Sequence, residues 1–201
     1  CIVLLHFTLL HKKKIMESSP GAIIAVDVDN LLISSAAAGQ DFFGYDLRAG
    51  FENMFAWVRT FADIVCLYLY LPMDQCIKND ELFQELWEKY RKEFIFELIY
   101  CPKKRSQETG KLVDDVDQHL IDHTKRMVDL LYPAVTFFCL ASGDLDYSPL
   151  LWELKRKEKL EIAFAIGSER SFSGAYRQMN LVAKHPSTGK ELIHYFLPRE
   201  Q

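Results

Sequence analysis

The chain lacks the features that mark a disulfide-bonded, disordered or repetitive protein. Its 201 residues contain five cysteines, none of them in a C-x-x-C pair, while hydrophobic residues make up 49% of the chain. Cys66, Cys101 and Cys139 lie in or beside apolar runs, where cysteine serves as a small core residue. We therefore expect one globular domain with a full core in an intracellular, reducing compartment, the cytoplasm or nucleus.

Positive charge is also scarce, since the formal net charge is −4 and the pI is about 5.9. This balance provides no general attraction for nucleic acid, so any such binding has to rely on local basic patches and bound metal. The sequence contains no G-x-G-x-x-G motif, no P-loop and no Ser/His/Asp arrangement. The common nucleotide-binding and serine-hydrolase motifs are therefore absent.

Apolar runs long enough for a membrane are missing as well. The apolar stretch Cys1–Leu10 is shorter than the roughly 20 residues that a membrane-spanning helix needs. Lysines follow this stretch, whereas the basic region of a secretory signal precedes its apolar region. With the first methionine at Met16, we expect residues 1–15 to be a non-native or disordered leader, residues 16–201 to form a single domain, and no membrane partner.

The rest of the chain alternates between apolar β-branched runs and segments with helical spacing. The runs predict strands at Gly21–Val28, Ile64–Leu71, Phe94–Tyr100, Ala134–Ala141 and Leu160–Ile166, with a short last strand at Leu192–Phe196. The helical spacing predicts helices at Asp46–Phe61, Asp80–Lys92, Asp114–Leu131, Tyr147–Lys157 and Gly174–Ala183. This alternation predicts a three-layer α/β/α fold with a mostly parallel central sheet of about five strands.

Three acidic clusters lie along this pattern, at Val26–Asn30, Asp114–Asp117 and Ser142–Tyr147. The first and third follow strongly apolar runs, so their carboxylates should emerge at the carboxyl ends of strands, where such sheets bind ligands. Carboxylates gathered at one edge repel one another unless cations neutralise them, and oxygen ligands suit Mg²⁺ or Mn²⁺. The pattern predicts a metal-dependent phosphoryl-transfer site.

The helix predicted at Asp114–Leu131 separates its acids by angle. At about 100° per residue, Asp117 falls on the apolar, core-facing side near the helix start. Asp115, His119 and Asp122 point the other way, so we expect Asp122 to face water. Asp117 is therefore the stronger candidate for a place beside the acids at the strand ends.

Two of these clusters carry a family resemblance. The segment Ser142–Tyr147, followed by Pro149 and Leu150, resembles the S-G-D-x-D-[FY]-x-P-L signature of NYN-domain proteins. Val26–Leu31 is similar to the opening apolar-D-x-[DE]-N-L segment of that family, and the match covers residues 21–167 in order. The resemblance implies a PIN-like, Rossmann-like α/β fold and a nuclease that cleaves RNA with Mg²⁺ or Mn²⁺.

The resemblance also implies roles for particular residues. It assigns metal binding and catalysis to four carboxylates, those of Asp27, Asp117, Asp144 and Asp146. It assigns orientation of the metal or the substrate to Asn30 and shaping of the substrate-binding turn to Ser142. The remaining acids of the clusters and the middle helix are further candidates: Asp29, Asp114 and Asp122.

The middle helix departs from the family pattern K-x-V-D-V-x-L-x-x-D. Asp117 takes the first acidic position and Leu120 the apolar one, but His123 stands where the second Asp is expected. Val28 also replaces the usual small residue after the first Asp. A catalytically weak or inactive domain that binds RNA or protein is therefore one alternative, and a metal-dependent phosphatase or flap-type DNA nuclease is another.

Basic residues gather in two places. The group Lys103, Lys104 and Arg105, with Lys111, follows the third predicted strand at the edge of the acids, so we expect it to contact phosphates of the RNA. The group at 155–157 ends a helix, where cations complement the helix dipole, and we expect a structural role. His119 and His123 have zinc-like i, i+4 spacing, but no third ligand is evident, so we expect solvated helix residues.

Overall fold

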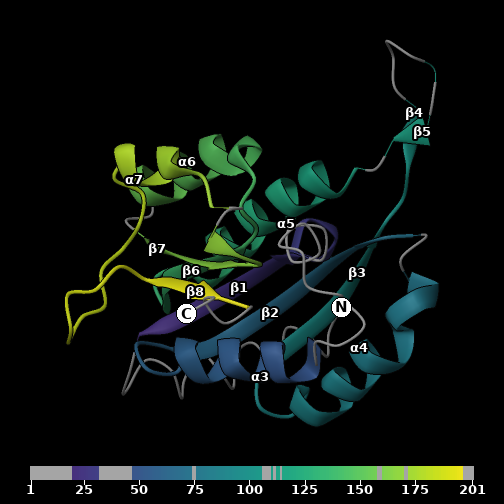
Figure 1. The fold of residues 1–201 in the computed structure, drawn as a ribbon, viewed down its shortest axis with the longest axis horizontal. Coiled ribbons are helices and arrows are strands. Elements are labelled where there is room, and N and C mark those ends of the chain that lie inside the picture. The colour runs from purple at the N-terminus through teal and green to yellow at the C-terminus, as the bar shows by residue number, and fades with distance from the viewer. Residues whose placement is uncertain are drawn as a thin grey trace.

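A six-stranded, all-parallel sheet runs through the centre of the protein (Figure 1). The structure is a computed structural model and describes residues 20–31, 47–73, 76–105, 110, 112–113, 115–157, 160–169 and 172–196. In spatial order the strands are β3 (Ile95–Cys101), β2 (Asp63–Pro72), β1 (Gly21–Asp27), β6 (Val135–Ala141), β7 (Glu161–Ile166) and β8 (Ile193–Tyr195). The leader expected at 1–15 lies outside the described residues, as do Lys111 and Asp114.

Helices cover both faces of the sheet, which confirms the predicted three-layer, Rossmann-like α/β/α fold. On one face lie α3 (Leu47–Val58) and α4 (Cys76–Tyr90). On the other lie α5 (Val116–Leu131), α6 (Ser148–Lys157) and α7 (Gly174–Gln178). The two inner strands, β1 and β6, are buried along nearly their whole length because they are covered on both sides.

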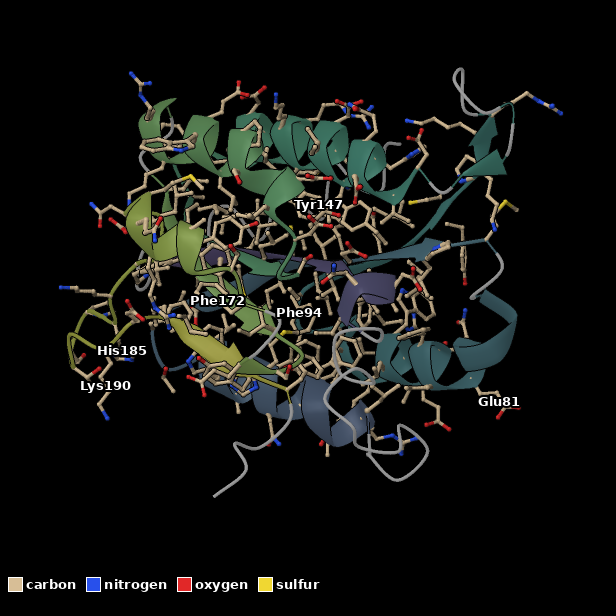
Figure 2. The ribbon with its side chains drawn as sticks, turned by 45° about the horizontal axis from the view of Figure 1, so that its top comes forward. Glu81, Phe94, Tyr147, Phe172, His185 and Lys190 are labelled. Atoms are coloured by element: carbon tan, nitrogen blue, oxygen red, sulfur yellow. The ribbon has the colours of Figure 1, made fainter. Side chains whose placement is uncertain are left out.

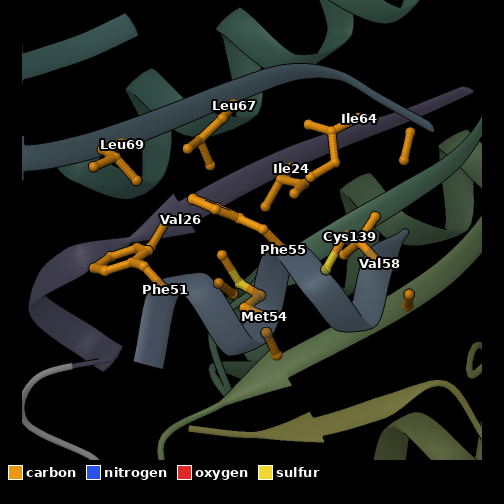
Figure 3. Packing of buried hydrophobic residues seen from close by; sticks show 14 of the residues in the cluster. Ile24, Val26, Phe51, Met54, Phe55, Val58, Ile64, Leu67, Leu69 and Cys139 are labelled. Atoms are coloured by element: carbon orange, nitrogen blue, oxygen red, sulfur yellow. The ribbon is translucent and has the colours of Figure 1, made fainter. Parts of the chain in front are cut away.

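The apolar periodicity of the helices places their buried faces. In α3 the side chains of Phe51, Met54, Phe55 and Val58 are buried and pack on strand residues such as Ile24 (Figure 3). In α5 the buried side chains form one stripe at helical spacing: Val116, Leu120, Thr124, Met127, Val128 and Leu131. Burial of these faces supplies the main hydrophobic stabilisation of the layers.

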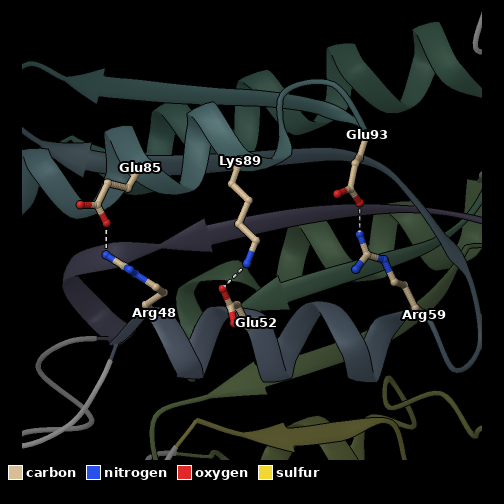
Figure 4. Close-up of polar contacts among 6 residues, drawn as sticks. All are labelled: Arg48, Glu52, Arg59, Glu85, Lys89 and Glu93. Atoms are coloured by element: carbon tan, nitrogen blue, oxygen red, sulfur yellow. Dashed lines mark hydrogen bonds and ion pairs between the residues drawn. The ribbon is translucent and has the colours of Figure 1, made fainter.

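Ion pairs link α3 to α4 on the outer surface (Figure 4). Arg48 pairs with Glu85, Lys89 with Glu52 at 2.6 Å, and Arg59 with Glu93, just beyond α4, at 2.6 Å. All of these side chains are substantially exposed, so each pair adds at most about 1 kcal/mol to stability. They orient the two helices more than they stabilise the fold.

Several predicted element ends were wrong. Helix α4 begins at Cys76, before the expected Asp80. The last helix ends at Gln178 rather than Ala183, because Asn180 adopts a positive φ of 53° and the Ala183 N–H bonds to Ile162 O at 2.8 Å. Pairing with β7 thus replaces the last helical turns.

Two connections also differ from the predicted pattern. A 3-10 turn, η2 (Leu145–Tyr147), precedes α6, so the helix expected from Tyr147 begins at Ser148. The connection after β3, for which no strand is predicted, contains a short antiparallel hairpin of β4 (Lys104–Arg105) and β5 (Leu112–Val113), which projects from the body of the protein in Figure 1.

Candidate functional site

The site lies where the strand order of the sheet reverses. From β1 the chain proceeds through β2 to β3 on one side, whereas β6, β7 and β8 lie on the other side. The carboxyl ends of β1 and β6 therefore flank a topological switch point, the usual ligand site of open α/β sheets. Asp27 is the last residue of β1, and Ser142 directly follows β6. The predicted placement of the first and third clusters is confirmed.

Asp27 is a buried carboxylate, with 4% of its surface exposed. Its Oδ1 accepts a hydrogen bond from the Asn30 N–H at 3.1 Å, and its Oδ2 lies 2.8 Å from the Tyr147 hydroxyl. Burial raises the pKa of Asp27 to about 6, the two hydrogen bonds oppose that rise, and the negative charges of Asp117 and Asp29 add to it. The two hydrogen bonds thus stabilise the ionised Asp27 carboxylate, and a nearby positive charge would stabilise it further.

Tyr147 joins this carboxylate to a second one on α5. Its hydroxyl also lies 2.6 Å from Oδ1 of Asp117, in the first turn of the helix. Figure 2 shows Tyr147 in the layer between the sheet and the helices of that face. A hydroxyl has one hydrogen, so it donates to one carboxylate, and the second short contact needs a proton on a carboxyl group. Asp27 and Asp117 therefore meet at one hydroxyl oxygen.

The turn after β6 is held against β1 by side-chain hydrogen bonds. The Oδ1 of Asn30 accepts from the Gly143 N–H at 3.2 Å, and the Oγ of buried Ser142 accepts from the Asp144 N–H at 3.2 Å. These contacts give Asn30 a structural role in addition to the orienting role that the resemblance implies, and they give Ser142 the turn-shaping role that the resemblance implies for it.

Asp144 serves as the N-cap of η2. Its Oδ1 accepts from the Asp146 N–H at 3.0 Å, and its backbone oxygen accepts a hydrogen bond from the hydroxyl of Tyr176. Asp144 is half-buried and Asp146 is exposed. The side chain of Asp144 is therefore oriented by its own turn.

The structure brings some of the predicted acids together and separates others. Asp27 and Asp117 share Tyr147, and Asp29 is close enough to raise the Asp27 pKa. Asp122 is exposed, as predicted. Within the part of the chain that is described, no group of three or more His, Cys, Asp or Glu side chains is arranged to hold a metal ion. The pair, rather than a full cluster, is what the described residues provide.

Two oxygen-bearing acids fit a hard divalent cation. Mg²⁺ usually keeps several waters and is bound by one or two carboxylates together with substrate phosphates, so it needs no cage of protein ligands. Asp27 and Asp117 supply such a pair with oxygen donors alone, which favours Mg²⁺ or Mn²⁺ over softer metals. Asp144 and Asp146 lie on the adjoining turn.

Tyr147 is a site residue that the sequence pattern does not single out. It occupies the aromatic position of the S-G-D-x-D-[FY] segment, and that position was the available signal. An aromatic residue after an acidic turn is ordinarily a core residue, and Tyr147 is indeed fully buried. Its contact with two carboxylates becomes visible only in the folded structure, where β1 and α5 each bring one carboxylate to its hydroxyl.

His123 is not the solvated residue that the sequence predicts. It is half-buried, its ring packs edge-on against Tyr68 with centroids 4.6 Å apart, and its Nδ1 lies 2.8 Å from the Tyr70 hydroxyl. Burial, and then the nearby Arg126, lower the pKa of His123. At the place where the family pattern has a second acid, this chain therefore has a neutral ring that packs on β2.

The basic residues of the hairpin are exposed, and neighbouring groups contact both Lys104 and Arg105. Lys104 forms an ion pair with Asp115, and the Arg105 guanidinium donates to Gly110 O at 3.0 Å. Lys103 is exposed at the start of the hairpin. In the second basic group, Lys155 Nζ donates to Asn180 O at 2.7 Å, in line with the structural role expected there.

A polar groove of about 720 Å³ lies between α5 and β3. It is lined by Glu97, Ile99, Asp115, Gln118, His119, Asp122, His123 and Arg126. Its carboxylates outnumber its one arginine, so the groove does not favour a phosphate backbone. It occupies the side of α5 that the helical angle assigns to Asp115, His119 and Asp122, away from the side that carries Asp117.

Comparisons with known proteins bear on the fold. The chain is similar in structure to a protein of unknown function from Vibrio parahaemolyticus, with a TM-score of 0.59 and 19% sequence identity over 78% of this chain and 86% of that chain. No family model and no curated protein matches the sequence. Among the described helices, none combines the length and apolar character needed to cross a membrane.

Proposed function

We propose that this protein is an NYN-type, divalent-metal-dependent nuclease that hydrolyses phosphodiester bonds of RNA as an endoribonuclease. One observation carries the proposal: Asp27 and Asp117 come together around one hydroxyl at the switch point of a parallel sheet. A buried acid paired with an exposed one in that position suits a divalent cation, and the adjoining S-G-D-x-D turn resembles the signature of NYN-domain nucleases. The fold is compatible with this assignment.

Each residue of the site then has a defined task. Asp27 and Asp117 would hold Mg²⁺ or Mn²⁺, and Asp144 and Asp146 would add carboxylates from the turn. When bound, such a cation lowers the pKa of a water molecule and neutralises phosphate charge. Asn30 keeps the turn against β1 through Gly143. Burial of Asp27 keeps bulk water from its carboxylate.

A second function is favoured by the middle of the site. Asp144 is engaged as the cap of η2, His123 replaces an expected acid, and no three-residue metal group occurs among the described side chains. These features favour a catalytically weak NYN domain that binds RNA or a protein partner. Such a domain binds RNA without turnover, even in Mn²⁺.

Product analysis with single-stranded RNA, structured RNA and flapped DNA separates the candidates. Wild-type protein should cleave RNA in Mg²⁺ or Mn²⁺, and EDTA or Asp27→Asn should stop cleavage. Asp129→Asn is the matched control, because it removes one exposed carboxylate from the same helix as Asp117. Cleavage that survives both EDTA and Asp27→Asn contradicts the proposal, and RNA binding without products supports the second function.

A further inference from the structure

Tyr147 is the last residue of η2 and is fully buried, yet its hydroxyl contacts two ionisable groups from distant parts of the chain. We propose that Tyr147 is a positioning residue that keeps the Asp27 and Asp117 carboxylates side by side, so that one divalent cation can bind both. This inference rests on the proposed function and adds to it a residue with no metal-binding role of its own.

The geometry supports positioning rather than simple packing. Oδ2 of Asp27 and Oδ1 of Asp117 approach the same hydroxyl oxygen to 2.8 and 2.6 Å. The two carboxylate oxygens therefore cannot lie further apart than the sum of these contacts. Two carboxylates this close repel each other, and the hydrogen bond that the hydroxyl donates to one of them offsets part of that repulsion.

The two acids depend on Tyr147 to different degrees. Asp27 is buried, and its other oxygen is already held by the Asn30 N–H at 3.1 Å. Asp117 is exposed in the first helical turn, and the Tyr147 hydroxyl is the contact that ties its carboxylate to the end of β1. Loss of the hydroxyl should therefore let the Asp117 side chain point into solvent. Binding of a cation would then have to order that side chain again, which costs conformational entropy.

Tyr176 provides a matched comparison in the same region. It is also fully buried, but its hydroxyl donates to the backbone oxygen of Asp144 rather than to a carboxylate. Replacement of either tyrosine by phenylalanine removes one buried hydroxyl and keeps the ring. Only Tyr147→Phe removes a hydrogen bond to a carboxylate group that would hold metal.

The test is direct Mn²⁺ binding by calorimetry, together with cleavage of RNA as a function of Mn²⁺ concentration. Hydrogen-bond partners of metal-binding carboxylates typically contribute 10–100-fold to metal affinity, so Tyr147→Phe should raise the Mn²⁺ Kd by about that factor. Saturating Mn²⁺ should restore most of its cleavage rate. Tyr176→Phe should bind Mn²⁺ as wild type does. A purely structural role for Tyr147 would instead lower the active fraction at every Mn²⁺ concentration.

A second readout does not depend on the folding of Tyr147→Phe. With 3-fluorotyrosine placed at position 147, Mg²⁺ should shift the fluorine resonance more than it does for the same label at position 176. If wild-type protein binds Mn²⁺ and folded Tyr147→Phe binds it with the same Kd, this inference is overturned and the proposed function is not. The same holds if wild-type protein binds Mn²⁺ and the fluorine shifts at positions 147 and 176 are equal. Wild-type protein that binds no Mn²⁺ overturns the proposed function and this inference with it.

Discussion

The side-chain oxygen of Asn30 accepts a hydrogen bond from the backbone N–H of Gly143 at 3.2 Å. This contact joins the acidic segment after β1 to the acidic turn after β6, which are 113 residues apart in sequence. The two segments that resemble the NYN family are thus held together by a side chain that carries no charge.

Asn30→Ala should loosen that connection. Loss of the acceptor leaves the Gly143 N–H without its partner, so stability to urea should fall by about 1–2 kcal/mol. RNA cleavage should fall as well, because the turn that carries Asp144 loses its contact with β1. Asn30→Asp retains an acceptor oxygen and should lose less stability. Equal stability of Asn30→Ala and wild type would show that the hydrogen bond between Asn30 and Gly143 does not stabilise the fold.

Asp27→Asn should make the metal-free protein more stable while it abolishes metal binding. The amide oxygen can accept from the Asn30 N–H and the amide nitrogen can donate to Tyr147, so both contacts survive without a buried charge. At pH 7.5 we expect a gain of about 1–3 kcal/mol in urea unfolding, in proportion to the raised pKa. A loss of stability in folded Asp27→Asn contradicts this expectation.

The gain from Asp27→Asn should depend on pH. The folded protein binds a proton at Asp27 between the ordinary pKa of 3.8 and the folded value of about 6, so this stabilisation is complete below 3.8 and is lost as pH rises through 6. The difference between the variant and wild type should therefore widen from pH 4 to pH 7.

Wild type alone is a poor readout of this effect, because His194 opposes it. Burial lowers the pKa of His194 to about 4, so its contribution to stability is lost as pH falls through 4. Subtraction of the two urea-unfolding curves cancels His194. A difference that stays constant with pH would rule out a raised pKa at Asp27.

Two variants of Asp144 should distinguish the role of its charge from its role as the N-cap of η2. Asp144→Asn keeps an oxygen that can accept from the Asp146 N–H, so it should fold with near wild-type stability but lose RNA cleavage. Asp144→Ala also removes the N-cap and should cost about 1 kcal/mol in thermal or urea unfolding. If Asp144→Asn cleaves RNA at the wild-type rate, Asp144 is a structural cap and no more.

The basic hairpin should matter for RNA affinity more than for cleavage chemistry. The double variant Lys103→Ala, Arg105→Ala should weaken RNA binding and reduce the slope of log affinity against log salt by about one to two. Lys155→Ala with Arg156→Ala removes as much positive charge from the end of α6 and should leave the slope nearly unchanged. Binding measured from low to moderate salt by fluorescence anisotropy checks both variants.

Local patterns predict much of this architecture because they report local physics. The apolar run before Asp27 predicts a strand buried on both faces, and the structure buries all of β1. Helical angle alone selects the buried face of α5 and places Asp122 in solvent. It also places Asp117 on the core-facing side, whereas Asp117 is exposed and only its Oδ1 reaches the buried Tyr147 hydroxyl. The hairpin after β3 and the early end of α7 could not be predicted, because pairing with other segments decides them.

Spacing within each segment is enough to predict that apolar strands alternate with amphipathic helices and that acids follow the first and fourth strands. Tertiary structure decided what those acids contact. Tyr147 meets Asp27 and Asp117 only because η2 is packed beneath α5 at the end of β1. Residues 120 and 30 positions apart have no local periodicity in common, so only long-range packing could bring them to one hydroxyl.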